Sequence, residues 1–168
     1  MAGEKPQDHG PEVHQLEFHD DVAAEAVKIA LAEEAQGVFE NDNDNRGPRV
    51  DEYQTVGGTL GQPWCAKFAC WCFQQAALKL GCPNPFPRIF AAGPLEKWGE
   101  QKKRLVARPE RGNVLIWKYR HVALVTGSAL DNGIVPSVEG NTWTGKIRKD
   151  GVYARKVREV SECKFVRL

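Results

Sequence analysis

Two residues in this sequence occupy positions that suit a reactive thiol and an imidazole that acts as a base. Cys65 follows the turn residues GQPW and opens the segment CAKFACWCFQQAALKL, whose periodicity predicts a helix. The unpaired N–H groups and the positive dipole end of a first helical turn favour a thiolate, the nucleophilic form of cysteine. His121 opens the apolar run HVALV, so we expect its side chain at the rim of a sheet, where it can act as a general base. The pair predicts a hydrolase that attacks carbonyl carbon.

The segment VEGNTW supplies a third polar group. Glu139 ends a predicted strand and Asn141 follows two residues later, so both side chains point to one side if the extended geometry continues. Either side chain can accept the second N–H of the His121 imidazole and so fix its orientation. A carboxylate would also stabilise the imidazolium that forms when Cys65 loses its proton.

Each candidate also has a structural explanation. Most cysteines are small buried hydrophobes, and a single glutamate is usually a surface charge. Trp64 and Trp143 are expected to wall a substrate groove, although packing in the core is the commoner fate of a tryptophan. The functional interpretation therefore rests on the combination of residues.

The elements that must position these residues begin with a helix. Residues 1–15 are polar and lack periodicity, so they are predicted to form a flexible arm before one domain that spans residues 16–168. The first helix is predicted to begin at an N-cap of Asp20 or Asp21 and to end at Gly37. Its apolar face comprises Val22, Ala26, Ile29 and Ala30.

Three further helices are predicted. Pro48 opens a short helix that stops at Gly57–Gly58, and the helix of Cys65 ends at Gly81. The stripe that this longer helix buries is predicted to consist of Ala69, Phe73, Ala76 and Leu80. The stretch CPNPFPRIF is too rich in proline for regular structure, and PLEKWGEQKKR is predicted to form a short helix.

Beyond Gly112 the pattern changes to short strands. Five β-rich runs are separated by turn segments, which is typical of an antiparallel sheet of about five strands. The runs are VLIW, HVALVTG, IVPSVEG, VYARKV and KFVRL. Helices followed by strands predict an α+β fold.

Composition excludes several classes of protein. The longest apolar stretch is far below the roughly 20 residues of a membrane span, and the opening MAGEKPQDHG lacks the apolar core of a signal peptide. We therefore expect synthesis in the cytoplasm without a signal peptide and no insertion into membranes. Action outside the cytoplasm would need a holin, lysis or a dedicated secretion machine.

The charge is unevenly distributed along the chain. Residues 1–100 carry 8 Lys/Arg and 16 Asp/Glu, whereas residues 101–168 carry 15 and 6, so the halves have net charges of −8 and +9. This pattern is typical of two solvated surfaces that attract each other within a domain, and a patch for an anionic ligand is the alternative. No motif that reads bases supports binding to nucleic acid.

The five cysteines, an odd number, indicate reduced thiols. Four of them show no metal-ligand spacing and are interpreted as small buried hydrophobes. These are Cys70, Cys72, Cys82 and Cys163. We expect neither a metal nor a cofactor.

Four segments, in this order, resemble the CHAP domains, the cysteine, histidine-dependent amidohydrolases/peptidases, which are related to the papain-like hydrolases of the NlpC type. The segments are NRGPRVDEY, GQPWCAKFACWCF, RGNVLIWKYRHVALVTG and VEGNTW. They extend from about Asn45 to Trp143, over half of the chain. The combined motif is specific, whereas each piece alone is weak.

The resemblance implies a papain-like fold in which the helix of Cys65 packs on the C-terminal sheet. It implies that Cys65 is the nucleophile, His121 the base and Glu139 the residue that orients the imidazole, while Asn141 completes the site. It implies peptidoglycan as the substrate, cut by an N-acetylmuramoyl-L-alanine amidase or by a peptidoglycan endopeptidase. Such a protein resembles a phage endolysin or a secreted antibacterial effector, and an effector would have a cognate immunity protein as partner.

Some members of the family bind calcium before the cysteine, and Asp42 and Asp44 resemble the start of such a loop. Arg46 stands at the next ligand position, so a polar turn is the expectation. Two other functions stay open. One is a papain-like thiol hydrolase that acts on an amide outside peptidoglycan, and the other is a catalytically silent wall-binding module.

Overall fold

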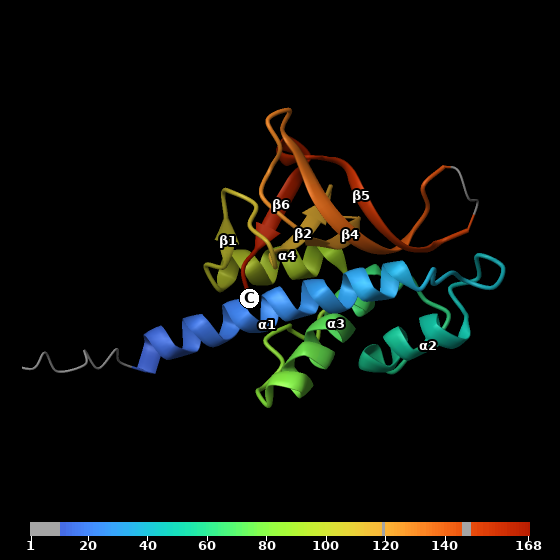
Figure 1. Cartoon of the computed structure of the whole chain (residues 1–168), viewed down its shortest axis with the longest axis horizontal. Helices are drawn as coiled ribbons and strands as arrows, with labels where there is room; N and C mark the ends of the chain where they lie inside the picture. Colours follow the sequence, from blue (N-terminus) through green and yellow to red (C-terminus); the bar gives the residue numbers. More distant parts are fainter. Residues whose placement is uncertain (1–10, 119, 146–148) are drawn as a thin grey trace, which may run out of the picture.

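The computed structural model describes residues 11–118, 120–145 and 149–168. In this part of the chain four α-helices pack on a six-stranded antiparallel sheet, which confirms the predicted α+β class (Figure 1). The helices are α1 (Pro11–Ala35), α2 (Pro48–Gln54), α3 (Cys65–Leu80) and α4 (Ala92–Gln101). Short 3₁₀ turns cover Thr55–Gly57 and Val160–Glu162.

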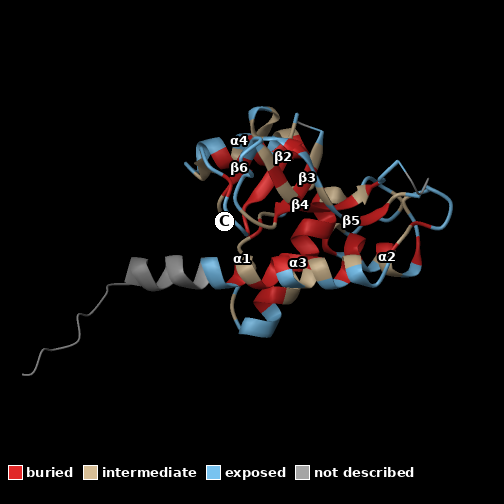
Figure 2. Cartoon of the chain, turned by 45° about the horizontal axis from the view of Figure 1, so that its top comes forward, coloured by how far each residue is buried: buried red, intermediate tan, exposed pale blue. Residues whose placement is uncertain are grey.

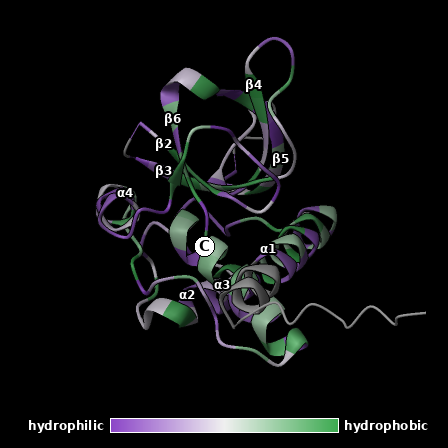
Figure 3. Ribbon diagram, turned by 90° about the vertical axis from the view of Figure 1, so that its left-hand side faces the viewer, coloured by the Kyte–Doolittle hydropathy of each residue, from purple (hydrophilic) through white to green (hydrophobic). Residues whose placement is uncertain are grey.

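The sheet is larger than the sequence indicated. Its strands are β1 (Leu105–Val106), β2 (Val114–Trp117), β3 (His121–Val125), β4 (Ile134–Thr142), β5 (Gly151–Glu159) and β6 (Cys163–Val166). The order across the sheet is β1-β6-β2-β3-β4-β5, so β6 lies between β1 and β2. The prediction of about five strands missed β1, because two residues are too short to form an alternating pattern. Figure 3 shows the strands on one side of the molecule, with α1, α2 and α3 on the other.

Alternation along the strands gives the sheet two different faces. Val114 and Val122 pack with the helices in the main core, whereas Leu115 and Ala123 belong to a smaller cluster. Side chains two residues apart on a strand share a face. His121 therefore lies on the same face as Ala123, away from the main core and at the beginning of β3.

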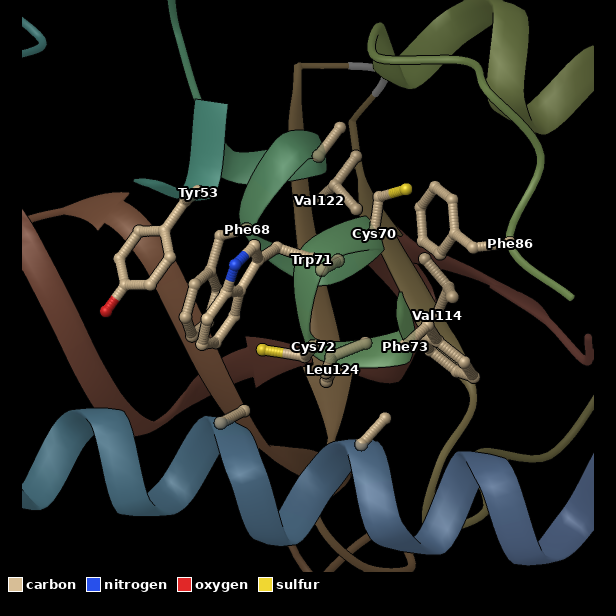
Figure 4. Close-up of a cluster of buried hydrophobic side chains, with 14 of the residues drawn as sticks. Tyr53, Phe68, Cys70, Trp71, Cys72, Phe73, Phe86, Val114, Val122 and Leu124 are labelled. Atoms are coloured by element: carbon tan, nitrogen blue, oxygen red, sulfur yellow. The ribbon is translucent and has the colours of Figure 1, made fainter. Parts of the chain in front are cut away.

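Helix α3 is the central element of the main core. Ala69, Phe73 and Ala76 are buried as predicted, and Figure 4 shows Phe73 beside other buried side chains of this helix. The prediction for Leu80 was wrong, since its side chain is 39% exposed. Leu80 is the last residue of the helix, and Figure 2 shows this end in solvent. Gly81 follows in the left-handed conformation and ends the helix as predicted.

Helix α1 is longer than predicted. It begins at Pro11, so the expected N-cap at Asp20 or Asp21 was wrong. Asp20 lies within the helix and pairs with Arg167 at 2.7 Å, an interaction between residues too distant in sequence to be predicted. Of the predicted apolar face, Val22, Ala26 and Ala30 are buried and Ile29 is partly buried. Residues 1–10 of the predicted arm lie outside the described residues, and residues 11–15 belong to α1.

The four cysteines outside the candidate site differ in burial. Cys70 and Cys72 are buried in the main core as expected (Figure 4), whereas Cys82 and Cys163 are only half-buried, so the expectation was wrong for these two. Burial raises the pKa of the Cys70 thiol to about 11 and that of the Cys72 thiol well above its ordinary value. Thiols held in the neutral form are poor nucleophiles.

No helix within the described ranges is both long enough and apolar enough to cross a membrane.

Candidate active site

Cys65 is the first residue of α3, and Trp64 is its N-cap without a capping side chain. The half-buried thiol accepts hydrogen bonds from the backbone N–H groups of Ala66 and Val122. Burial raises the pKa of the Cys65 thiol, but the hydrogen bond and the charge of His121, together with those N–H groups, outweigh burial and lower the pKa below its ordinary value of 9.0. This cysteine is therefore held toward its reactive form.

His121 stands between Cys65 and Glu139. Its side chain is 12% exposed, and Nε2 lies 3.0 Å from Oε2 of Glu139. The N–H of Nε2 is not aligned with a hydrogen-bond acceptor among the described residues, so the contact between His121 and Glu139 is an ion pair. Since Nε2 faces the carboxylate, Nδ1 is the ring nitrogen left for the thiol that is hydrogen-bonded to this histidine.

The protonation of His121 follows from its neighbours. Burial lowers the pKa of the imidazole, but the contacts with Cys65 and Glu139 raise it to about 9. The thiol pKa falls while the imidazole pKa rises, and both shifts favour transfer of the shared proton from the thiol to the ring. The two shifts thus favour a thiolate–imidazolium pair, the activated form of a cysteine nucleophile.

Glu139 is fully buried, and its charge is balanced from two sides. Arg158 donates through Nε to Oε1 at 3.0 Å and through Nη2 to Oε2 at 2.6 Å, and Ser137 donates to Oε1 at 2.8 Å. Burial raises the pKa of the Glu139 carboxyl, but His121 and Arg158 outweigh burial and hold the pKa far below its ordinary value. Glu139 therefore stays ionised and holds the imidazole by charge.

Arg158 and Ser137 were missed in the sequence. Arg158 lies on β5, and its guanidinium stacks over the ring of Trp117 at 4.2 Å from the centroid. Nothing in VYARKVRE indicates that this arginine, among several basic residues, turns inward. The position of Ser137 did carry a signal, because it precedes Glu139 by two residues on the same strand and so shares its face.

Of the two side chains that could orient the imidazole, Glu139 contacts it, whereas Asn141 contacts the segment before Cys65. Its Oδ1 accepts a hydrogen bond from the backbone N–H of Trp64 at 3.0 Å, and its Nδ2 donates to Glu40 at 3.0 Å and to Asn45 at 3.1 Å. No direct contact joins it to His121 among those recorded for the described residues. Asn141 thus fixes the segment immediately before Cys65 and acts as a positioning residue.

The expectation that Trp64 walls a groove was wrong. Its side chain is fully buried, and its Nε1 donates to Oε1 of Glu40 at 2.7 Å. Glu40, itself buried, also accepts from the backbone N–H of Asn45 at 2.8 Å. The tryptophan therefore anchors the beginning of α3 to the loop before α2, and it has no surface to offer a substrate.

Gly140 allows β4 to approach α3 closely. A Cβ atom at this position would lie 2.5 Å from the ring of Trp64 and 2.8 Å from Phe68. Real Cβ atoms do not come that close to their neighbours, so a larger residue would push the helix and the strand apart. Because Cys65 lies on one of these elements and Glu139 on the other, this glycine sets the spacing of the site.

Trp143 and His121 line one shallow groove. It has a volume of about 480 Å³, and the Trp143 side chain is 51% exposed. The remaining lining residues are Trp117, Arg120, Thr142, Thr144, Gly145, Arg155 and Arg158. The sequence-based expectation that Trp143 walls a substrate groove is compatible with this position.

The loop before α2 forms a hydrogen-bonded turn. Asp44 accepts from the backbone N–H of Arg46 at 3.0 Å, and Arg46 pairs with Asp51 at 2.8 Å. Among the residues that the structure describes, no three His, Cys, Asp or Glu side chains gather as a metal-binding group. Asp44 thus stabilises the turn.

A comparison with protein-family models matches residues 57–141, about half of the chain, to the CHAP domain. The chain belongs to the CHAP family. The matched range contains Cys65, His121, Glu139 and Asn141, and it ends at Asn141. Searches of curated proteins and of solved structures gave no match.

Membership in the CHAP family implies a cysteine- and histidine-dependent amidohydrolase or peptidase, a class that typically acts on peptidoglycan. In this CHAP chain Arg158 lies outside the matched range, so the partner of Glu139 comes from the segment beyond it.

Proposed function

We propose that this protein hydrolyses an amide bond of peptidoglycan, with Cys65 as nucleophile, His121 as base and acid, and Glu139 as the residue that orients the imidazole. The observation that supports this most directly is the chain of contacts from the thiol through His121 to a fully buried carboxylate. A catalytically silent wall-binding module would have no chemical need for this arrangement.

The proposed reaction begins with attack of the Cys65 thiolate on the amide carbonyl carbon. A tetrahedral intermediate forms, and the backbone N–H of Cys65 at the beginning of α3 is the proposed donor to its oxyanion. The His121 imidazolium gives its proton to the leaving amine as the C–N bond breaks, which leaves an acyl thioester on Cys65. Neutral His121 then removes a proton from water, which hydrolyses the thioester and restores the thiolate–imidazolium pair.

The test is mass spectrometry of purified peptidoglycan after incubation with the native protein in reducing buffer. We expect new fragments whose masses identify the bond: free stem peptides for an amidase, or split stems or cross-links for an endopeptidase. Cys65→Ala should release none. Cys82→Ala is the matched control, since it removes a half-buried thiol outside the site and should leave the activity intact.

If the native protein releases no fragments from several wall types, peptidoglycan is the wrong substrate. A panel of other amides would then test the thiol-hydrolase alternative, and sedimentation with intact walls would test a binding module. Fragments released equally by native protein and Cys65→Ala would refute the role of the thiol.

The proposal includes action at the cell wall after holin release, lysis or secretion, as a phage endolysin or an antibacterial effector with a cognate immunity protein. Its test is expression in a bacterial host with and without an added export signal. Exported protein should lyse the cells, whereas unexported protein and exported Cys65→Ala should not. Lysis by unexported protein at the same level would contradict this part of the proposal.

A further inference from the structure

The groove beside His121 carries positive charge that the catalytic residues do not use. Arg158 is hydrogen-bonded to Glu139, and His121 contacts Glu139 and the Cys65 thiol. Arg120 and Arg155 are different, since neither forms an ion pair with a carboxylate in the described part of the chain. No Asp or Glu is among the described residues that line the groove. The groove therefore has two cationic side chains available for an anion.

The two arginines differ in how firmly they are held. Arg155 is half-buried, and its Nη1 donates to Oγ1 of Thr142 at 2.8 Å and to the backbone oxygen of Trp143 at 2.7 Å. Both bonds use the same nitrogen, so the other N–H groups of this guanidinium are left for a ligand. Arg120 is exposed on the turn between β2 and β3, directly before His121. Guanidinium groups bind carboxylates through paired N–H donors.

The position of the groove relative to the catalytic pair tells which part of a substrate it would hold. His121 lines it, whereas Cys65 does not. In the proposed reaction the acyl part becomes attached to the Cys65 sulfur, and the leaving amine takes its proton from His121. A groove bounded by the imidazole and not by the thiol lies on the side of the leaving amine.

We propose that this groove is the binding site for the amine-side fragment of the substrate, and that Arg120 and Arg155 bind a carboxylate of that fragment while Trp143 packs against its apolar part. This inference rests on the proposed function, because it assigns a side to a reaction at Cys65. It narrows the substrate to amides whose amine-side residue carries a free carboxylate close to the bond that is cut. The groove volume of about 480 Å³ is within the usual range for small-ligand sites.

The test uses two synthetic substrates built around the bond that fragment analysis identifies. They differ only in the amine-side residue, which carries a carboxylate in one and a carboxamide in the other. The native protein should cleave the acid with a kcat/KM about tenfold higher, the size of one charge-assisted hydrogen bond. Arg120→Gln should reduce this preference several-fold, by lowering kcat/KM for the acid while leaving kcat/KM for the amide unchanged. Arg120→Lys should restore part of the preference.

Arg108→Gln is the matched control, because Arg108 is exposed and lies outside the groove. This substitution changes the net charge by the same amount as Arg120→Gln. It should leave the preference unchanged. Equal cleavage of acid and amide by the native protein would overturn the inference and leave the peptidoglycan assignment intact. An equal loss of kcat/KM on both substrates in Arg120→Gln would also overturn the inference. If the native protein releases no fragments from any wall, the proposed function fails, and the inference falls with it.

Discussion

The pH range of activity is expected to depend on Glu139. The rise in the pKa of His121 from 6.5 to about 9 corresponds to about 3 kcal/mol in favour of the imidazolium. Both Cys65 and Glu139 contribute to it against burial, so replacing the carboxylate with a neutral amide should remove about half of this free energy. Glu139→Gln should therefore lower the pKa of His121 by at least about one pH unit.

The direction of the change follows from the roles of the two groups. The proposed reaction needs the imidazolium, so we expect activity below the pKa of His121 and its loss as the pH rises through about 9. The reaction also needs the thiolate, so we expect activity to be lost as the pH falls through the lowered pKa of Cys65. Glu139→Gln should lower the pH at which activity is lost on the alkaline side. Because the imidazolium that stabilises the thiolate is then less favoured, it should also raise the pH at which activity is lost on the acid side. The active range narrows from both sides.

The assay is kcat/KM for fragment release across pH, with the rate of Cys65 alkylation by iodoacetamide as a second measurement that needs no substrate. Glu159→Gln is the matched control, since Glu159 is an exposed carboxylate next to Arg158 in the chain. Glu139→Gln leaves the Arg158 charge buried without a counter-ion, which lowers the free energy of unfolding. The double variant with Arg158→Met removes both charges. Unchanged limits in a folded single or double variant would refute the role assigned to Glu139.

Three further perturbations test the structure around the site. Arg158→Met should lower the free energy of unfolding by about 3 kcal/mol, because it leaves the buried Glu139 charge with a single ionic partner, and urea denaturation at neutral pH measures the loss. Protonation of the carboxyl should shrink this loss at low pH, and a loss independent of pH would contradict the charge argument. Gly140→Ala should lower both stability and kcat/KM, since the added Cβ meets the buried Trp64 ring at 2.5 Å; a melting temperature equal to that of the native protein would show that the strand and helix can separate without cost. Trp143→Ala should leave the unfolding free energy nearly unchanged, because the side chain is 51% exposed, while raising KM for fragment release; an unchanged KM would remove Trp143 from the substrate groove.

Residues whose environment is set by local sequence were predicted well. Cys65 begins its helix because turn residues precede it and a helical periodicity follows, and Gly81 ends that helix in the left-handed conformation. His121 begins β3 as expected from the apolar run after it. In each case the deciding information lies within a few residues of the position.

Residues whose environment is set by distant partners were not predictable in this way. Trp64 was expected to wall a substrate groove, but its burial depends on Glu40 and on the close approach of β4 at Gly140. Arg158 is opposite Val135 in the register of β4 and β5, and its guanidinium turns inward to reach Glu139 further along β4. This contact depends on that register and on its irregularities. Charge and hydropathy of the segment alone describe such an arginine as a surface residue.

The position of β6 in the sheet has a consequence for when the site can exist. The strand comes after all the others along the chain, yet it lies between β1 and β2, and β2 is the neighbour that supports the strand of His121. Arg158 on β5 also follows Cys65 and His121 in the sequence. When the growing chain has been synthesised only as far as His121, it contains Cys65 and His121 but lacks Arg158 and most of the sheet that holds them. Such non-local pairing is slow to form, so we expect the thiol to become reactive only when the C-terminal strands dock.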